Sequence, residues 1–248
     1  MRTPRLYLNS ELASGRVISL PAPAVQYLVQ VLRLRAGDPL ILFNGDGHDY
    51  PAEVLGANRQ RVEARLGGPG PRAPPPPLQV HLGIGISRGE RMDFTLQKAV
   101  ELGVAEVTPL FAGRAVVRLE GERLSKRLGH WQGVMIAASE QCGRRRLARL
   151  NPAQPLTTWL DLGHPVPLLL DPRAARALAG LAPPGPALTL LIGPEGGLAP
   201  AEREQAYAAA HNGIQPPSPA ATDPAAGAGF SSMLQGVMTN MTQTTRAA

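Results

Sequence analysis

The sequence predicts an α/β protein in which a small, β-rich first domain precedes a domain built on a mostly parallel sheet. Strand-like and helix-like segments alternate from Gln79 onward, and this alternation is typical of a parallel sheet with crossover helices. The segment "GGPGPRAPPPP" (67–77) lies before them and can form neither a helix nor a central strand, so we expect a stiff polyproline spacer. We therefore predict one domain over residues 1–72 and a second over 73–248.

The composition indicates a protein that folds without covalent cross-links. With 248 residues the chain can bury a real core. Its single cysteine, Cys142, excludes an internal disulfide. The first residues, "MRTPRLYLNS", contain no apolar stretch of signal-peptide length, and no apolar run approaches the ~20 residues of a membrane helix. We expect a cytoplasmic protein.

The charge favours nucleic acid as a partner. The formal net charge is +6, and all but two of the 25 cationic side chains are arginines. Arginine grips phosphate through its planar fork and stacks on bases, so an arginine-dominated basic surface points towards nucleic acid. The alternative is that a GC-rich gene has inflated the arginine content.

The first domain is predicted from short apolar runs and one turn signal. The residues Asn44–Gly47 ("NGDG") form a strong hairpin signal. One helix is expected over Val25–Leu32, ending near Gly37. The strand-like runs are Arg5–Leu8, Pro39–Phe43, Asp49–Leu55 and Arg61–Leu66.

The second domain is predicted from alternating elements. The helix over Arg91–Val104 is indicated by the spacing of Phe94, Ala99 and Leu102, with Gly103 as its stop. Two further helices are expected over Arg123–Cys142 and Arg173–Leu181. The expected strands are Gln79–Ile86, Glu106–Phe111, Val166–Asp171 and Ala187–Gly193.

The segment "LLIGPEGGLAPAE" (190–202) is the strongest candidate for a ligand site. An apolar strand runs directly into Gly193–Gly197, and a helix is predicted from Pro200. Ligands of open α/β sheets bind beyond the carboxyl ends of the strands, and a glycine-rich turn before a helix can present backbone N–H groups to an anionic or polar ligand. The alternative is a tight structural turn, because the segment matches neither GxGxxG nor the P-loop.

Four blocks in order resemble the ribosomal RNA small subunit methyltransferase E (RsmE) family. They are "VLRLRAGD" with "LFNGDG", "SRGERMDFTLQKAVELGVAEVTPLF", "AASEQCGRRR" and "IGPEGGLAPAE", and the resemblance spans Arg2 to about Gly213. It implies a homodimer with an N-terminal PUA-like, RNA-binding β-barrel. It also implies a SPOUT-type methyltransferase domain that contains a trefoil knot, an exception among protein folds.

The resemblance further implies an activity. Such proteins use S-adenosylmethionine to methylate N3 of one uridine in 16S rRNA of the small ribosomal subunit. Uridine N3 carries a proton at neutral pH, so a group must remove that proton or stabilise the resulting anion. The target base must also leave its stack, because its Watson–Crick edge is the edge that reacts.

The site residues that we predict fall into three groups. Glu140 and Arg144 are the catalytic candidates, although a Glu and an Arg four apart can be an ordinary surface pair. No metal site is expected, because the histidines lack ligand spacing and Cys142 is better explained as a small buried residue. We predict cofactor binding by Leu170, Ile192, Gly193, Pro194, Glu195, Gly196 and Gly197, and RNA phosphate contacts by Arg33, Lys98, Arg114 and Arg118. Glu195 can alternatively be a plain helix N-terminal carboxylate, and Lys98 a partner of Glu101.

The sequence departs from the family pattern after Gly213. The family has a second cofactor loop of the form LGxRILRxETA, followed by an apolar helix; here the tail reads "IQPPSPAATDPAAGAGFSSMLQ" and onward, a composition typical of disorder. Three hypotheses remain: an RsmE-type enzyme, an RNA-binding relative with an incomplete cofactor site, and a SPOUT enzyme acting on ribose, against which the shared blocks argue.

One interpretation of the tail is that it is read out of frame. Thr222–Gly227 can be encoded as ACG GAT CCT GCG GCT GGA, which shifted by one nucleotide begins Arg-Ile-Leu-Arg-Leu. That sequence is close to the core of the absent loop. Genuine divergence of the terminus is the alternative.

Overall fold

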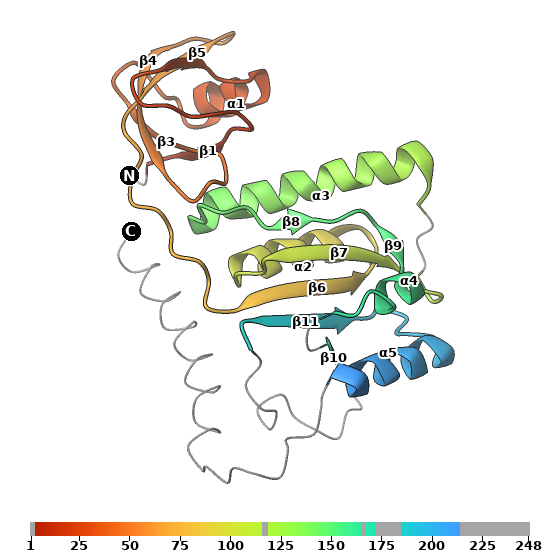
Figure 1. Cartoon of the computed structure of the whole chain (residues 1–248). Coiled ribbons are helices and arrows are strands. Elements are labelled where there is room, and N and C mark those ends of the chain that lie inside the picture. The colour runs from red at the N-terminus through yellow and green to blue at the C-terminus, as the bar shows by residue number, and fades with distance from the viewer. Residues whose placement is uncertain (1–2, 116–118, 165–166, 172–184, 214–248) are drawn as a thin grey trace. The chain divides into compact units, whose positions relative to one another are not determined.

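The computed structural model describes residues 3–115, 119–164, 167–171 and 185–213 (Figure 1). The chain separates into two compact units. Unit 1 comprises Met1–Pro75, Leu96–Leu102 and Gly129–Ala148, and unit 2 comprises Pro76–Thr95, Gly103–Leu128 and Arg149–Ala248. Two long helices, α2 (Gly89–Glu101) and α3 (Gly121–Cys142), contribute residues to both units, so each unit is assembled from separate stretches of the sequence.

Unit 1 contains a five-stranded mixed sheet with the strand order β1-β3-β4-β5-β2. Strand β1 pairs parallel to β3, and the other neighbours pair antiparallel. The strands are β1 (Arg5–Tyr7), β2 (Val17–Ser19), β3 (Pro39–Phe43), β4 (Tyr50–Ala57) and β5 (Val62–Leu66). Four of them were predicted, and β2 was missed because its three residues carry no alternating pattern.

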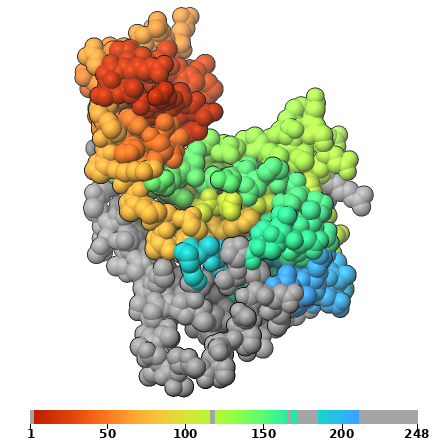
Figure 2. All heavy atoms as spheres, viewed as in Figure 1, coloured from red at the N-terminus to blue at the C-terminus, as the bar shows by residue number. Residues whose placement is uncertain are grey.

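The sheet of unit 1 curls around one apolar core (Figure 1). Alternate residues of each strand point inward, so that Leu40 and Leu42 of β3 and Val54 of β4 are almost completely buried. Leu28, from the helical segment, completes this core. On the face drawn in Figure 2 the side chains of this part, in red to orange, form a continuous surface over it.

The helix of unit 1 begins earlier than predicted and changes its winding. Helix α1 covers Ala22–Gln26, with Pro21 at its N-cap. The predicted start at Val25 was wrong by three residues: proline is tolerated in the first helical turn, so the helix can begin among the prolines at 21 and 23. The chain then continues as a π-helix over Tyr27–Val31. Arg33 lies two residues after the end of this π-helix. Its φ of 56° is the only positive value at a non-glycine residue in the described chain.

The hairpin prediction is confirmed, and so is the expected absence of helix and strand from the proline-rich segment. Strands β3 and β4 pair antiparallel, with Leu42 opposite Tyr50, and the loop between them contains "NGDG". Residues 67–77 form neither helix nor strand. This segment is fixed to the chain beside β4, because the N–H groups of Gly67 and Gly70 donate to the carbonyl oxygens of Pro51 and Asp49 at 2.7 Å each.

Unit 2 contains a six-stranded sheet in which every described pairing is parallel, as the alternation of elements predicted. The main strand order is β10-β11-β6-β7-β8, and β9 pairs with the last residues of β7. The arrowheads of β6, β7 and β11 accordingly point the same way in Figure 1. The strands are β6 (Gln79–Gly85), β7 (Glu106–Phe111), β8 (Arg149–Leu150), β9 (Gln154–Pro155), β10 (Pro167–Leu169) and β11 (Ala187–Ile192).

Helix α2 exists where it was predicted, but the residues that indicated it are not the ones that it buries. Met92, Leu96 and Val100 are fully buried, whereas Phe94 and Leu102 are 62% and 64% exposed. The pattern of Phe94, Ala99 and Leu102 therefore indicated the right structure from residues on the wrong face. One large apolar side chain of α2, Phe94, and that of Leu102 directly after the helix are thus left outside the core.

Two further helices belong to unit 2. Helix α4 (Leu156–Leu160) was not predicted, and helix α5 (Pro200–Gly213) begins at the proline where it was expected. The Trp159 ring of α4 is buried and packs over Gly83 of β6, where a Cβ would lie 2.5 Å from the ring. The predicted helix over 173–181 lies outside the described residues. Within the described ranges no helix is long and apolar enough to cross a membrane.

Candidate active site

In unit 2 the order in which the chain adds strands reverses between β6 and β11. A ligand site is expected at this point of the sheet. The chain adds β7 on one side of β6 and β11 with β10 on the other. Ile84 of β6 lies in register with Ile192 of β11, so the two strands end side by side. Crevices at such switch points, outside the carboxyl ends of the strands, are the usual ligand sites of open α/β sheets.

The loop after β11 needs its glycines for backbone reasons. The N–H of Gly197 donates to the carbonyl of Pro194 at 2.8 Å, closing a turn in which Gly197 has a φ of +68°, a value that favours glycine. A Cβ at Gly196 would lie 2.9 Å from the carbonyl oxygen of Arg114. The close approach that glycine permits at position 196 is therefore to this chain's own backbone, at a residue predicted for RNA contact.

The neighbouring strand carries a matching glycine. A Cβ at Gly85, the last residue of β6, would collide with the ring of Pro194. The backbone of the glycine-rich loop is thus seated directly on the end of the adjacent strand. This contact fixes the height of the loop above the sheet.

Helix α5 is anchored to the same edge by one carboxylate. Glu202, in its first turn, accepts the N–H of Ala199 at 2.8 Å and the N–H of Gly113 at 2.7 Å. The first bond satisfies an N-terminal donor in the manner of a capping box. The second bond ties the helix start to the chain just beyond β7. The loop 193–199 is consequently held at both ends.

Glu195 connects the glycine-rich loop to the loop that follows β6. Its Oε1 accepts the N–H of Arg88 at 3.0 Å and lies 3.7 Å from Nη1 of Arg91. The pKa of Glu195 is lowered by hydrogen bonds from its own N–H and from the N–H of Arg88, with smaller contributions from Ser87 and Arg91. Glu195 is therefore a charged bridge between two loops that lie far apart in the sequence.

A pocket of about 650 Å³ opens beside this bridge. Such a volume lies within the range typical of small-molecule sites. Arg91 and Phe94, both from the first turns of α2, are largely exposed in it. It is lined by Ile84 and Ser87 after β6, by Glu90, Arg91, Phe94 and Thr95 of α2, and by Ile192, Gly193, Pro194 and Glu195.

The predicted cofactor residues gather at this edge of the sheet. Four of the seven, Ile192 to Glu195, line the pocket, and Gly196 and Gly197 continue the same loop. Leu170 follows β10, where its N–H donates to the carbonyl of Leu191 at 3.0 Å, so it lies beside the end of β11 on the side away from β6. Its side chain is 42% exposed.

Glu140 and Arg144 lie in unit 1, where the chain uses both of them. Glu140 Oε1 accepts the N–H of Tyr7 at 2.9 Å. Burial raises the pKa of this carboxyl group, and the Tyr7 N–H and Arg5 oppose the increase. Arg144 donates from Nη1 to the carbonyl of Val100 at 3.0 Å, and burial lowers the pKa of its guanidinium. These contacts give both residues a structural task, and their catalytic role stays a prediction.

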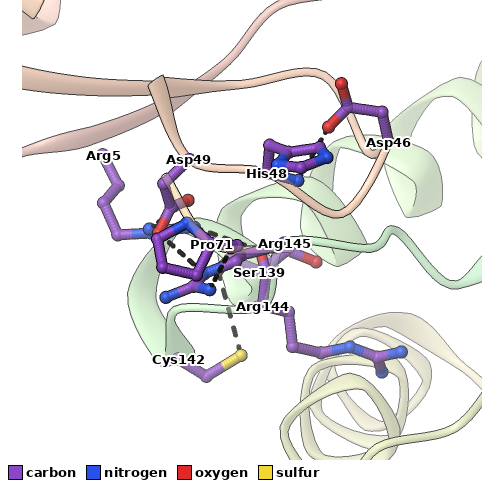
Figure 3. A network of polar contacts seen from close by, with 9 residues as sticks. All are labelled: Arg5, Asp46, His48, Asp49, Pro71, Ser139, Cys142, Arg144 and Arg145. Carbon is purple, nitrogen blue, oxygen red and sulfur yellow. Dashed lines mark hydrogen bonds and ion pairs between the residues drawn. The ribbon is translucent and has the colours of Figure 1, made fainter. Parts of the chain in front are cut away.

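The segment that follows Glu140 belongs to a polar network within unit 1 (Figure 3). Asp49 forms ion pairs with Arg5 at 2.7 Å and with Arg145 at 3.0 Å, and its side chain is only 16% exposed. Arg145 also donates to the carbonyl of Pro71 at 2.8 Å. The arginine run 144–146 is thus largely committed to holding unit 1 together.

The four predicted RNA contacts are divided between the two units. Arg33 is exposed and lies in unit 1. Lys98, also of unit 1, is paired with Glu101 at 2.7 Å, as its alternative interpretation proposed. Arg114 is exposed beside the glycine-rich loop of unit 2. Arg118 lies outside the described residues.

Comparisons with known proteins bear directly on this geometry. A family model for an RNA methyltransferase domain matches residues 74–215, and one for an RNA methyltransferase PUA domain matches residues 20–67. The chain belongs to the RNA methyltransferase family. The residues matched by the first model include the glycine-rich loop, the pocket and helices α2 to α5.

Individual relatives of this RNA methyltransferase agree with the family models. The ribosomal RNA small subunit methyltransferase E of Buchnera aphidicola is 31% identical over 206 residues, which cover 82% of this chain and 84% of that protein. The Bacillus subtilis protein of the same name is 25% identical and covers 79% of this chain and 81% of its own. A crystal structure from Neisseria gonorrhoeae, described as ribosomal RNA small subunit methyltransferase E bound to S-adenosyl methionine, superposes with a TM-score of 0.80.

That structure is 34% identical in sequence and covers 94% of this chain and 96% of its own. The resemblance drawn from the four sequence blocks is therefore confirmed. The fold is the α/β, SPOUT-type methyltransferase fold with a PUA-like N-terminal domain. The tail after Gly213, where the sequence departs from the family pattern, lies outside the described residues.

Six of the ten residues that line the pocket of this RNA methyltransferase were not predicted from the sequence, among them Ser87, Arg91 and Phe94. Ser87, Arg91 and Phe94 belong to a block that was used for the family resemblance and for predicting a helix, but not for predicting this pocket. A topological signal was available, because the loop after the first strand of a parallel sheet faces the same edge as the loops after the other strands. Their position beside the glycine-rich loop, however, depends on β6 and β11 being neighbours. The order of strands in a sheet cannot be read from the sequence.

Proposed function

We propose that this protein transfers a methyl group from S-adenosylmethionine to N3 of one uridine in 16S rRNA of the small ribosomal subunit. The observation that carries the proposal is the glycine-rich loop 193–197, seated on the end of β6 at the switch point and opening onto a pocket. The named relatives act on small-subunit ribosomal RNA, and a similar protein holds S-adenosyl methionine.

The residues at the carboxyl edge fit such a cofactor. The loop presents backbone with little side chain at Gly193, Gly196 and Gly197, and Leu170 adds an exposed apolar surface at the end of the adjoining strand. We propose Leu170 and Ile192 to Gly197 as its binding residues. When bound, the cofactor supplies a methyl group on a positively charged sulfur. The chain's own part is to orient that group and to exclude other acceptors.

The basic surface supports the choice of an RNA substrate. We propose that residues 1–72 act as an RNA-binding domain and residues 73–248 as the methyltransferase domain. The phosphate contacts would come from Arg33, Lys98, Arg114 and Arg118. Contacts to the phosphates of a nucleic acid position it without reading its sequence. We also propose that the protein works in the cytoplasm, where ribosomal RNA is found, and that it forms a homodimer, as the family resemblance implies.

Two measurements test the proposal. Calorimetry with S-adenosylmethionine should detect a single class of site. Incubation with radiolabelled cofactor and small ribosomal subunits should label 16S rRNA at one uridine, where reverse transcription stops because a methyl group on N3 blocks Watson–Crick pairing. Binding of RNA without any binding of the cofactor would overturn the proposal and indicate a relative that has lost its cofactor site.

A further inference from the structure

We propose that the pocket between the loops after β6 and β11 receives the target uracil. Phe94 supplies the surface on which the base stacks, Arg91 is the cation that faces the reacting imide, and Glu195 is the residue that positions Arg91. The inference rests on the proposed function, because it names the chain's own groups that handle the substrate base. Two experiments distinguish failure of this pocket to bind the base from failure of the proposed methyl transfer.

The aromatic ring at this site is not used by the core. Phe94 is 62% exposed and lies in the pocket lining, while its helix buries Met92, Leu96 and Val100 instead. The chain has only four phenylalanines, four tyrosines and two tryptophans. A flipped RNA base is commonly held by stacking on an aromatic face, and this contact tolerates any base because each one has a π-face.

The cation of this pocket is Arg91, which forms a long ion pair with Glu195 on one side. The side chain of Arg91 is 74% exposed, and its Nη1 lies 3.7 Å from Oε1 of Glu195. Glu195 itself is fixed by the N–H of Arg88 at 3.0 Å. A guanidinium has five N–H donors, so an ion pair on one edge leaves donors for a ligand. Glu195 thus orients Arg91 while the rest of the fork faces the pocket.

The chemistry of the substrate explains why a cation is useful there. In the transfer, the N3–H bond of uracil breaks and its proton passes to solvent water. The electron pair left on N3 forms the bond to the methyl carbon, and the carbon–sulfur bond breaks with its electrons remaining on sulfur. Negative charge spreads over the imide oxygens as the proton leaves, and a preorganised cation at those oxygens lowers the energy of this anion. Arg91 acts as that cation and not as the base.

The pocket adjoins the predicted cofactor loop on the side opposite Leu170. Residues Ile192 to Glu195 line the pocket, and Leu170 lies beyond the other side of β11. The same short loop therefore separates the place proposed for the base from the place proposed for the cofactor. Two reactants that share one loop are held close together, which removes much of the entropic cost of their meeting.

The first experiment measures binding without turnover. A short single-stranded RNA carrying the target uridine is compared with the same RNA lacking that base, at fixed salt and without cofactor. The wild-type protein should bind the complete RNA about ten-fold or more tightly, as expected for one stacked base. Phe94→Leu and Arg91→Met should lose most of this difference, and Phe94→Tyr should keep it.

Arg149→Met is the matched control. Arg149 is 76% exposed and lies 3.9 Å from Glu106, so it closely resembles Arg91 in exposure and ion pairing, but it lies at the amino ends of the strands. This variant should retain the base-dependent part of the affinity. If Arg91→Met and Phe94→Leu discriminate the two RNAs as well as wild type does, the pocket does not hold the base and the inference is overturned.

The second experiment uses the pH dependence of methyl transfer. Without Arg91 the uracil anion forms less readily, so the rate of Arg91→Met should fall at neutral pH and recover as the pH rises, displacing the profile to higher pH. Glu195→Gln should show a smaller displacement in the same direction. An unchanged profile in Arg91→Met would overturn the role of the cation. If wild type transfers no methyl group, the proposed function fails, and the binding comparison still decides whether the pocket holds the base.

Discussion

Arg33 occupies a backbone conformation that ordinarily belongs to glycine. Its φ is 56°, and it follows Leu32, the residue that caps the π-helix. A non-glycine residue in the left-handed region costs roughly 1–2 kcal/mol, and such outliers often mark functional positions. An exposed arginine retained at this cost supports its proposed contact with RNA phosphate.

We expect Arg33→Gly to separate stability from binding. Relief of the backbone strain should leave the free energy of unfolding unchanged or raise it by up to about 1 kcal/mol, because glycine also makes the unfolded chain more flexible. RNA affinity should fall evenly across sequences, and the salt dependence should lose about 0.7 of a unit of slope. Denaturant titration and RNA binding at several salt concentrations measure the two effects.

Arg33→Ala is the companion variant. It removes the same charge but retains a Cβ in the left-handed region. RNA binding should weaken as in Arg33→Gly, without any gain in stability. Equal RNA affinity in all three proteins would remove Arg33 from the RNA surface.

Gly85 supports the glycine-rich loop from below. We expect Gly85→Ala to displace Pro194, because the added Cβ would collide with its ring. The substitution should lower the free energy of unfolding by about 1–3 kcal/mol, the usual cost of overpacking, and should weaken S-adenosylmethionine binding measured by calorimetry. Gly133→Ala is the control, since that helical position of α3 has open space and should gain about 0.5–1 kcal/mol. Undiminished cofactor affinity in Gly85→Ala would mean that the loop is free to move.

At the scale of elements, β6 and β7 share a partly buried polar cluster near their amino ends. The His81 ring interacts through Nε2 with the hydroxyl of Thr108 at 2.8 Å, and Nδ1 lies 3.5 Å from Glu106. The His164 ring lies 5.3 Å from it, between centroids. Burial lowers the pKa of His81, His164 lowers it further, and Glu106 opposes both. The folded protein thus favours the neutral imidazole.

The sign of the pH dependence follows from this shift. The unfolded chain binds a proton near the ordinary pKa of 6.5, and the folded chain binds it only at lower pH. The stability contributed by neutral His81 is complete above pH 6.5 and is lost as the pH falls towards the folded pKa. The Tm should therefore drop as the pH falls from about 7.5 to about 5.5, and the drop should be smaller in His81→Gln. An identical drop in both proteins would assign the effect to other groups.

The elements that were predicted and those that were missed differ in what determines them. Strands such as Glu106–Phe111 were predicted with the bounds that they have, because a short, mostly apolar run between two helical patterns is typical of a buried strand. Strands β8 and β9 have two residues each and exist only through their pairing with β7. Helix α4 has five residues and buries Trp159. No local pattern specifies segments this short.

The candidate site was predictable in part for a similar reason. Glycines 193, 196 and 197 indicate an unusual loop in any context. Arg91 and Phe94 look like ordinary residues of an amphipathic helix, and Phe94 was used only for the spacing that predicted this helix. Their importance depends on which strands are neighbours, and strand order is a property of the tertiary fold. The sequence therefore pointed to one wall of the pocket and not to the other.

At the scale of the whole molecule, unit 1 is completed by two distant stretches. Residues 96–102 and 129–148 belong to it together with the first 75 residues. Asp49 depends on Arg145 for one ion pair, and the Tyr7 N–H depends on Glu140. The polar groups of the early strands are thus satisfied by residues from late in the chain.

We expect the isolated fragment 1–75 to be poorly stable. It would leave the Asp49 side chain, which is only 16% exposed, with one partner fewer, and breaking a buried pair is strongly destabilising, by about 3–5 kcal/mol. Circular dichroism should show a Tm for the fragment that is much lower than that of the full chain, or no cooperative transition at all. Addition of a peptide of residues 129–148 should raise it. A fragment as stable as the full chain would show that unit 1 does not need its later residues.

The way unit 1 is assembled also limits how this protein can change through evolution. A domain encoded by one continuous stretch of gene can be exchanged between proteins by recombination at a linker. Here a cut in the proline-rich segment would transfer the strands but leave Glu140, Arg144 and Arg145 behind with the other product. A new RNA-binding part would have to arrive with matching substitutions near the end of α3. The two halves of such a gene are therefore expected to be inherited together.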